Sequence, residues 1–438
     1  MTQISKQKQI TGWIVFDWAN SAYNLVIVST VFPIIFNAFV PNGSTFLGIT
    51  FASSDSLYTY AMCFSYLIIS LITPVLSGIA DYGGYKKRYM QVFSTMGAIA
   101  CASLFLFDKE HQWIGILGAI IASIGFSGSL VFYNGFLSEI VPKKLHDKVS
   151  AKGFSYGYLG SSVLLIVVIL LDTFKEHLGV TGEKDPIIFR ISFILVGVWW
   201  FGWARWTFSV LPKGKKSDLP KKEMMAKGFD ELKHVWHQIK KLPRLKRFLS
   251  AFFVIDLGVQ TIVIIAPLFA MKVFDMEGGE LVPLVLIMQF LGIAGAFVFS
   301  KVSKKHGNVI GLAGPSIVYT LVCIVACFAA QKWMVYLIAG MIGFAMGGIQ
   351  SLFRSTYSKL LPPTNDHASF FSFFDITEKI AIVLGLFTYA GVEVIASGME
   401  SGFAERLGVA TLGVFFLIGL LLLKRLNNFK SLDLLLED

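Results

Sequence analysis

Apolar residues occur in long runs that short polar segments interrupt throughout the chain. A helix needs about 20 predominantly apolar residues to cross the hydrocarbon core of a bilayer. Twelve segments meet this requirement, and each is predicted to be a membrane-spanning helix. Their expected bounds are 11–39, 56–80, 89–107, 112–136, 153–172, 187–211, 248–274, 281–300, 309–330, 333–358, 370–397 and 406–424. The predicted fold class is therefore an all-α polytopic membrane protein.

The composition agrees with this class and excludes several others. The chain has 438 residues, of which 55% are hydrophobic and 15% are charged, and its mean hydropathy is +0.67. A soluble domain is about 45–50% apolar and about 25% charged. Intrinsic disorder, a collagen-like chain, a disulfide scaffold and an ordinary soluble enzyme are therefore excluded. The four cysteines lie in apolar runs without disulfide or zinc spacing, so no metal and no cofactor is expected.

Positive charge is divided unevenly between the two sides of the predicted bundle. The chain has 38 Lys and Arg residues. Of these, 28 lie in or next to loops on the same side of the membrane as the N-terminus, and six lie on the opposite side. Loops rich in Lys and Arg stay in the cytoplasm. We therefore expect a multi-pass protein of the cell membrane with both termini in the cytoplasm. The net charge of +10 then reflects topology and contact with lipid, and it requires no nucleic-acid partner.

The longest polar segment, 212–247, separates two halves of six predicted helices each, 1–211 and 248–438. Apolar residues recur in it every three or four positions, at Met225, Phe229, Leu232, Trp236 and Ile239. Lysines surround them, a pattern typical of an amphipathic helix on an anionic membrane surface. A linker helix that packs on the bundle is an equally good interpretation.

The arrangement of two six-helix halves around a long basic loop resembles the major facilitator superfamily, whose members bind substrate between two such halves. The loop after the second predicted span matches the signature loop of that superfamily at Asp81, Gly84, Lys86 and Arg88. It departs from the signature at Ser77, where the family has glycine, and at Tyr85, where it has a basic residue. A decayed copy of the loop follows the eighth span, at 300–307.

Three further stretches resemble one branch of that superfamily, the vacuole-effluxer-like transporters. They are Phe-Asp-Trp-Ala-Asn-Ser-Ala-Tyr at 16–23, Tyr-Asn-Gly-Phe-Leu at 133–137 and Gly-Gly-Ile-Gln-Ser-Leu-Phe-Arg-Ser at 347–355. Fungal members of this branch are autophagy-related exporters of amino acids. The resemblance implies a transporter of small solutes, with amino acids as the first candidate. A sugar, a peptide or a drug-like solute is the alternative, because this fold serves many cargoes.

Polar side chains inside the predicted spans are candidates for a substrate cavity. Ionisable and amide groups are costly in lipid and are expected to face the interior of a bundle. In the first span, Asp17, Asn20 and Asn24 fall on one arc of a helix, and Asp256 and Gln260 share a face of the seventh span. The residues expected to line the cavity are Asn20, Asn24, Asp256, Gln260, Gln289 and Gln350.

Acids outnumber bases in the inner halves of the spans. Asp17, Asp256, Asp375 and Glu378 face only Arg354 and Lys379 there. A carboxyl group away from water favours its neutral form and can carry a proton. We therefore predict coupling to protons or sodium through Asp17, Asp256 or Glu378. The alternative for Asp17 is that it locks the first span.

Ion pairs are the alternative role for the other charges. Asp256 is compatible with a pair to Arg354 or Lys379, and Asp375 and Lys379 are spaced to neutralise each other along one helix. Arg354 suits either a substrate carboxylate or a gate.

Candidate gate and structural residues lie at the inner ends of the spans: Asp81, Gly84, Arg88, Glu139, Arg354, Asp375 and Lys379. Glu139 is a candidate partner for Arg88 or Lys86, and pairs of this kind hold a transporter closed on one side.

The sequence has no phosphate-binding loop and no catalytic cluster, so neither a nucleotide-driven pump nor an enzyme is predicted. The predicted function is secondary active transport by alternating access. The expected partners of the chain, itself expected to be a monomer, are a small-molecule substrate and membrane lipids.

Overall fold

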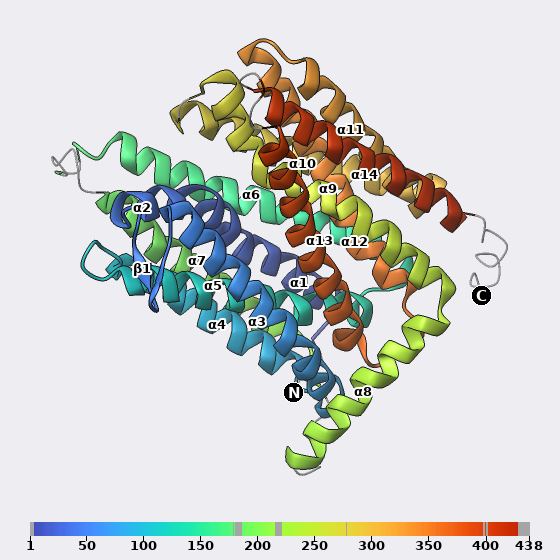
Figure 1. The fold of residues 1–438 in the computed structure, drawn as a ribbon. Coiled ribbons are helices and arrows are strands. Elements are labelled where there is room, and N and C mark those ends of the chain that lie inside the picture. Colours follow the sequence, from blue (N-terminus) through green and yellow to red (C-terminus); the bar gives the residue numbers. More distant parts are fainter. Residues whose placement is uncertain are drawn as a thin grey trace. The chain divides into compact units, whose positions relative to one another are not determined.

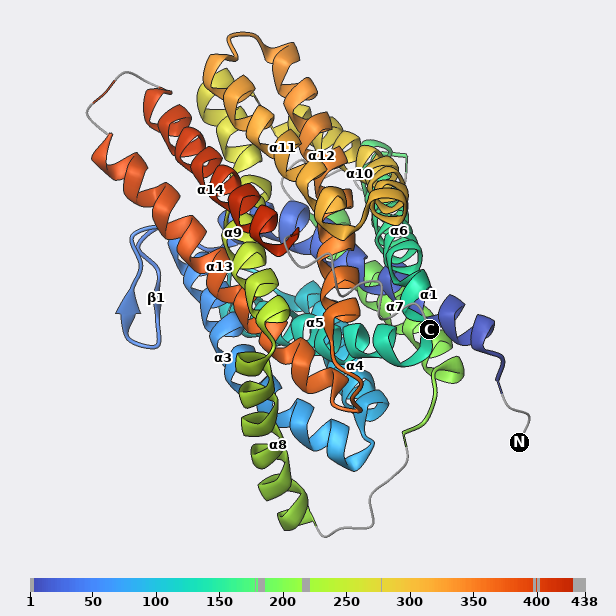
Figure 2. The ribbon, with the colours of Figure 1, turned by 90° about the vertical axis from the view of Figure 1, so that its right-hand side faces the viewer.

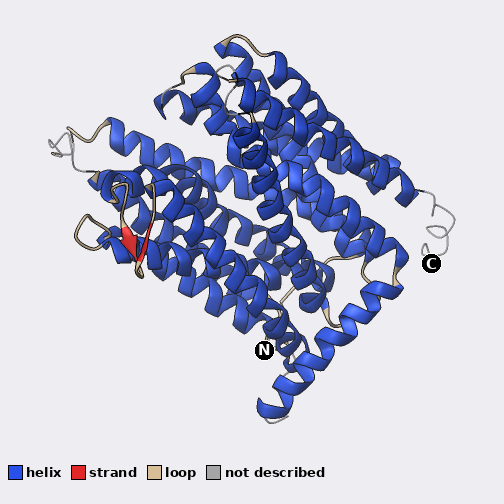
Figure 3. Ribbon diagram, in the orientation of Figure 1, coloured by secondary structure: helices blue, strands red, loops and turns tan. Residues whose placement is uncertain are grey.

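The computed structural model describes residues 4–177, 179, 186–214, 221–276, 278–396, 399 and 402–427. This part of the chain is almost entirely helical, as Figure 3 shows. The exception is a small antiparallel hairpin of β1 (Thr45–Phe46) and β2 (Ile49–Thr50), in which Thr45 pairs with Thr50.

The helices follow one another as labelled in Figure 1. In the first part of the chain they are α1 (Lys6–Ala22), the π-helix η1 (Tyr23–Val31), α2 (Phe32–Phe39), α3 (Ser54–Gly83), α4 (Lys86–Ser103), η2 (Leu104–Leu106), α5 (Gln112–Ile140), η3 (Lys143–Leu145), α6 (His146–Thr173) and α7 (Ile187–Val210). They continue with α8 (Lys221–Lys241), α9 (Pro243–Phe274), α10 (Gly278–His306), α11 (Asn308–Phe328), α12 (Lys332–Leu360), α13 (His367–Ile395) and α14 (Phe403–Asn427).

Within the described ranges, 11 helical segments are long and apolar enough to cross a membrane, and they coincide with 11 of the predicted spans. The remaining predicted span, 370–397, corresponds to α13, a helix of 29 residues. Its length suffices to cross the bilayer at 1.5 Å of rise per residue. Asp375, Glu378 and Lys379 lower its hydropathy, so the twelve-helix prediction is consistent with the fold.

The chain divides into two compact units. The first consists of Met1–Phe136 and Tyr156–Leu232, and the second consists of Leu137–Ser155 and Lys233–Asp438. The end of α5, the turn η3 and the start of α6 thus belong to the second unit, although they come from the first half of the sequence.

In the first unit, α7 packs against α1, η1 and α4. Neutral hydrogen bonds join its helices: Trp13 Nε1 donates to the Tyr133 carbonyl at 2.8 Å, and Thr207 Oγ1 donates to the Gly12 carbonyl at 2.8 Å. The backbones of α4 and α5 approach each other so closely at Gly97 and Gly125 that a Cβ at Gly125 would overlap the α4 backbone. Small residues at such crossings are typical of membrane helices.

In the second unit, α10 packs along α12, α14 packs against α9 and α11, and α13 packs against α9 and α14 (Figures 1 and 2). The α10–α12 contact again depends on glycine. A Cβ added at Gly343 or Gly347 would overlap the backbone of α10. Of the two charged helices, α9 packs against α12, and α13 packs against α9.

The predicted amphipathic helix of the linker is present as α8. Its apolar residues differ in how far they are buried. Val235 and Ile239 are buried, whereas the rings of Phe229 and Trp236 are each 46% exposed. The side chain of Met225 lies outside the described residues.

Candidate functional site

The first span changes its helical form in the middle. After Ala22 the chain continues as a π-helix from Tyr23 to Val31. Two hydroxyls on this segment bond to carbonyls five residues earlier: Ser29 Oγ donates to Asn24 O at 3.0 Å, and Thr30 Oγ1 donates to Leu25 O at 2.8 Å. Such π-segments are often found at functional sites.

The polar residues predicted on this span fall into two groups. Asp17 and Asn20 are buried, at 4% and 1% exposure, whereas Asn24 on the π-helix is exposed. Asn20 Nδ2 has no hydrogen-bond partner among the described residues. A buried donor left without a partner costs about 1–3 kcal/mol. Asn20 is therefore a group that would gain from an incoming acceptor.

Helices α9 and α13 of the second unit bring together charges predicted on two different spans. Gln260 Nε2 on α9 donates to Asp256 Oδ1 at 3.2 Å, one turn earlier on its own helix. The same nitrogen lies 3.5 Å from Glu378 Oε1 on α13. Gln260 thus bridges two carboxyl groups of different helices.

Lys379 lies near the same Glu378 oxygen. Its Nζ is 3.4 Å from Asp375 Oδ1 and 3.9 Å from Glu378 Oε1. Asp256 and Asp375 are buried, and the Oδ2 atom of each has no hydrogen-bond partner within the described ranges. In this part of the structure three carboxyl groups therefore share one amine and one amide. We call Asp256, Gln260, Asp375, Glu378 and Lys379 the acid cluster.

Arg354 on α12 contacts the start of α6 within the second unit. Its Nε donates to Ser150 Oγ, and its Nη2 donates to the Ser150 carbonyl, both at 3.0 Å. The guanidinium also lies over the ring of Phe154, 4.1 Å from its centroid. These contacts anchor the start of α6 to α12, which is a structural arrangement.

A second charged group beside this anchor was not among the predicted site residues. Asp147 accepts hydrogen bonds from Lys359 Nζ at 2.6 Å, from Ser303 Oγ at 2.8 Å and from Asn308 Nδ2 at 3.1 Å. It joins the start of α6 to α10, α11 and α12. The sequence signal was present, because Asp147 is an acid between Lys144 and Lys148 in an otherwise basic segment.

The signature loop has a local structural role. Gly84 ends α3 in the left-handed conformation, at φ 69°, which suits glycine. Lys86 Nζ lies 3.3 Å from Asp81 Oδ1. Arg88 and Glu139 are both exposed and belong to different units, so their pairing stays a prediction.

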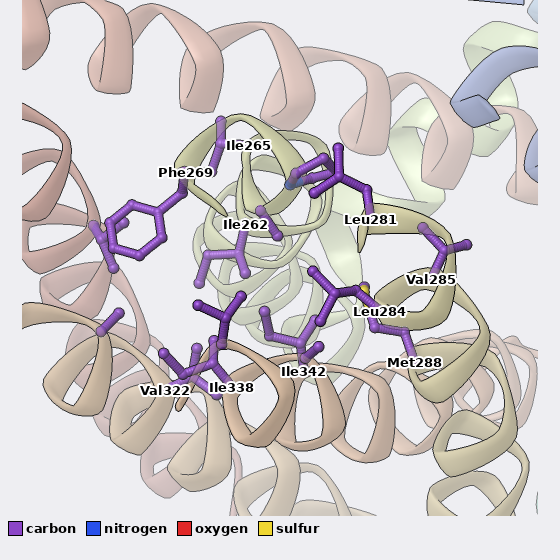
Figure 4. Close-up of a pocket in the computed structure, with 16 residues that line it drawn as sticks. Ile262, Ile265, Phe269, Leu281, Leu284, Val285, Met288, Val322, Ile338 and Ile342 are labelled. Atoms are coloured by element: carbon purple, nitrogen blue, oxygen red, sulfur yellow. The ribbon is translucent and has the colours of Figure 1, made fainter. Parts of the chain in front are cut away.

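The remaining predicted cavity residues lie on α10 and α12. Gln289 is buried at 9% exposure, and its Oε1 has no hydrogen-bond partner in the described part of the chain, while Gln350 is half-buried. A pocket in the second unit, shown in Figure 4, has a wholly apolar lining that includes Ile262, Leu284 and Ile342. This pocket is therefore separate in chemistry from the acid cluster.

The fold is shared with solved transporters. The human organic anion transporter MFSD10 (TETRAN) superposes over 96% of this chain and 100% of its own, with a TM-score of 0.71 and 11% identity. The E. coli fucose:proton symporter FucP covers 96% of this chain and 98% of its own, with a TM-score of 0.66 and 14% identity. The protein has the fold of a major facilitator superfamily transporter, as predicted.

Sequence comparison narrows this class. The family model "Vacuole effluxer Atg22 like" matches residues 5–432, and the chain belongs to that family. The MFS-type transporter YxiO of Bacillus subtilis (strain 168) is 28% identical over 97% of this chain and 96% of its own. Autophagy-related protein 22-1 of Penicillium rubens is 24% identical over 76% of this chain and 69% of its own. The chain is therefore a multi-pass membrane transporter.

Proposed function

We propose that this transporter moves a small solute, with amino acids as the first candidate, by alternating access driven by a proton gradient. The observation that carries the proposal is the acid cluster, in which Asp375 and Glu378 face Lys379 and Gln260 links Glu378 to Asp256. A lysine can balance one carboxylate, so the cluster has room for a further positive charge.

Protonation is the simplest way to supply that charge. A carboxyl group removed from water is more stable when it is neutral, and access to water lets it ionise. Asp256 is 2% exposed and Glu378 is half-buried, and Gln260 contacts both. A proton bound at this pair on one side of the membrane and released on the other would couple transport to the gradient. Sodium is the other cation that these oxygens suit.

The amino-acid assignment is supported by family and by chemistry. The relatives include autophagy-related proteins of fungi, and the family model is that of a vacuole effluxer. The Asn20 Nδ2 donor, which has no partner among the described residues, suits the carboxylate of an amino acid. A sugar, peptide or drug-like solute remains the second candidate, because MFSD10 and FucP are described as transporters of organic anions and fucose.

Reconstitution into proteoliposomes tests both parts of the proposal. Counterflow with a panel of labelled amino acids, sugars and peptides identifies the substrate without any need for coupling. Uphill uptake is then measured with an imposed proton gradient and, separately, a sodium gradient. Equilibration of the substrate without accumulation under either gradient would show a facilitator and would overturn the proposed mechanism.

We also place both termini in the cytoplasm and the protein in the cell membrane, because 28 of the 38 basic residues lie on one predicted side. Two exposed positions test this in a chain whose cysteines are replaced by alanine. Ile49→Cys should react with an impermeant maleimide added to intact cells, and Lys305→Cys should not. The reverse pattern would invert the topology.

A further inference from the structure

Helix α8 has two apolar faces with different surroundings. Val235 and Ile239 are buried against the protein. Phe229 and Trp236 remain 46% exposed, although both are large aromatic residues on a polar helix. Burial within the chain therefore accounts for one face of α8 and covers only about half of each aromatic side chain on the other.

The exposed face alternates aromatic and basic residues. Phe229, Lys233, Trp236 and Lys240 follow one another at intervals of four, three and four, which places all four on the same side of a helix. Both lysines are exposed, and Lys240 Nζ lies 4.8 Å from the centroid of the Trp236 ring. We call these four residues the aromatic–lysine face.

The end of α8 lies close to the edge of a membrane span. Leu242 is the single residue between α8 and α9, and the apolar run of α9 begins at Phe248. The turn between them carries Arg244, Lys246 and Arg247. The six residues 242–247 separate α8 from the apolar run, and six residues of helix span roughly 9 Å. This distance is close to the thickness of one headgroup layer, so α8 ends at the membrane surface.

We propose that the aromatic–lysine face binds the headgroup of an anionic phospholipid. Rings with a wet edge and lysines with apolar stems are the side chains that settle in the interfacial layer. The lysines carry the charge that attracts a phosphate. The phosphate of a zwitterionic lipid is balanced by the lipid's own cation, so charge complementarity with two lysines selects an anionic lipid.

This lipid is also placed to influence transport. The ring of Trp236 stacks on that of Phe373 on α13, with centroids 5.6 Å apart and planes 23° apart. Phe373 lies two residues before Asp375 and five before Glu378 of the acid cluster. A lipid held on Trp236 therefore stabilises one position of α13. This regulatory step rests on the proposed function, whereas lipid binding does not.

Lipid binding is tested in proteoliposomes by quenching of tryptophan with brominated lipids. The difference in fluorescence between the wild type and Trp236→Phe isolates the signal of Trp236. Brominated phosphatidylglycerol should quench this signal more than brominated phosphatidylcholine at the same bulk fraction. Lys233→Gln with Lys240→Gln should reduce the preference roughly tenfold or more, as expected for two lysines at a charged surface.

Lys304→Gln with Lys305→Gln is the matched control, because both are exposed lysines at the end of α10. This control should keep the preference. Equal quenching by the two lipids, or an equal loss in the control, would overturn the proposal. Soluble glycerol phosphate should not relieve the quenching, and relief would identify a site for free phosphate instead of lipid.

The regulatory step has its own readout. Substrate counterflow is measured while phosphatidylglycerol replaces phosphatidylcholine. The wild type should become faster, and the Lys233→Gln, Lys240→Gln variant should need a larger anionic fraction for the same rate. Lipid preference without any change in counterflow would overturn the regulatory step and keep the binding site. Loss of uphill uptake with normal counterflow would contradict the proposed coupling mechanism and leave the lipid proposal unaffected.

Discussion

The first and second units hold polar groups inside the membrane in different ways. In the first unit, helices are joined by neutral donors, such as Trp13 to the Tyr133 carbonyl and Ser65 to Ser123. In the second unit, Gln260 of α9 contacts Glu378 of α13, which also faces the Lys379 amine. A neutral hydrogen bond does not change when a proton arrives, whereas a cluster of acids does.

This difference assigns separate tasks to the two units. The buried donor of Asn20 and the π-helix after it can recognise a substrate without any change of charge. The acid cluster can take up a cation and respond through Lys379. We therefore expect coupling to depend on the second unit and substrate affinity to depend on the first.

The largest expected effect separates the three candidate coupling acids. Asp256→Asn and Glu378→Gln should each abolish uphill accumulation in proteoliposomes, because an amide cannot load and release a proton. Exchange of substrate down its gradient should continue. Asp17→Asn, on α1 of the first unit, should keep uphill accumulation.

Matched substitutions control for the change of side chain. Glu393→Gln alters the same helix as Glu378, at an exposed pair with Lys272, and Asp275→Asn alters the end of α9 at a left-handed position that asparagine tolerates. Both should transport uphill as the wild type does. Uphill transport by both acid variants, together with its loss in Asp17→Asn, would reverse the assignment of tasks.

The next effect concerns stability. Lys379→Met removes the amine that faces Asp375 and Glu378, and breaking a buried ion pair costs about 3–5 kcal/mol. Asp375 can relieve part of this by taking up a proton, so we expect a loss near 3 kcal/mol. Unfolding in mixed micelles of dodecyl maltoside and dodecyl sulfate measures the free energy.

Adding Asp375→Asn to Lys379→Met should restore part of this stability, because one of the two carboxylates that face Lys379 is then gone. Lys272→Met breaks a pair whose lysine is half exposed and should cost at most about 1 kcal/mol. A Lys379→Met protein as stable as Lys272→Met would show that the acid cluster is already neutral.

The sequence predicted the spans because lipid imposes a strict requirement on length and polarity. It did not predict where the helices end. The seventh span was expected to begin at 248, whereas α9 begins at Pro243. Arg244 and Lys246 continue the helix beyond the apolar run. The length of the apolar run depends on the thickness of the hydrocarbon core, whereas the helix itself extends into the polar interface.

The site was predictable where its contacts are local along the chain. The pair of Asp375 and Lys379 follows from helical spacing, and it was expected as an alternative. The contact of Asp147 with Lys359 joins residues 212 positions apart, and no periodicity reports it. The π-helix was not predictable from the apolar pattern either. Its hydrogen bonds from Ser29 and Thr30 go to backbone carbonyls, which the spacing of apolar residues does not report.

A moderate effect is expected at the first unit. Asn20→Leu keeps the number of side-chain heavy atoms and removes the donor that has no partner within the described residues. If that donor binds substrate, the KM in exchange should rise about tenfold, which corresponds to about 1.4 kcal/mol for a lost hydrogen bond. The protein should be no less stable, since an unsatisfied buried group is removed.

The position at the outer end of the same span provides the control. Asn37 Oδ1 accepts a hydrogen bond from Ser54 Oγ at 2.5 Å, so Asn37→Ala should lower stability slightly and leave the KM unchanged. An unchanged KM in Asn20→Leu would contradict the proposal that the first unit recognises the substrate through this donor.

The smallest expected effect measures the neutral contacts themselves. Ser65 and Ser123 are buried, and their hydroxyls meet at 2.8 Å between α3 and α5. Hydrogen bonds between membrane helices contribute about 0.6 kcal/mol on average, because each partner finds another acceptor when the bond is lost. Ser65 Oγ also lies 2.7 Å from the Met62 carbonyl of its own helix, so this fallback is present. Ser65→Ala, Ser123→Ala and the double variant, unfolded in the same micelles, should give a coupling energy near this value. A coupling as large as the cost of Lys379→Met would contradict the contrast between the two units, because neutral and charged contacts would then hold the helices equally.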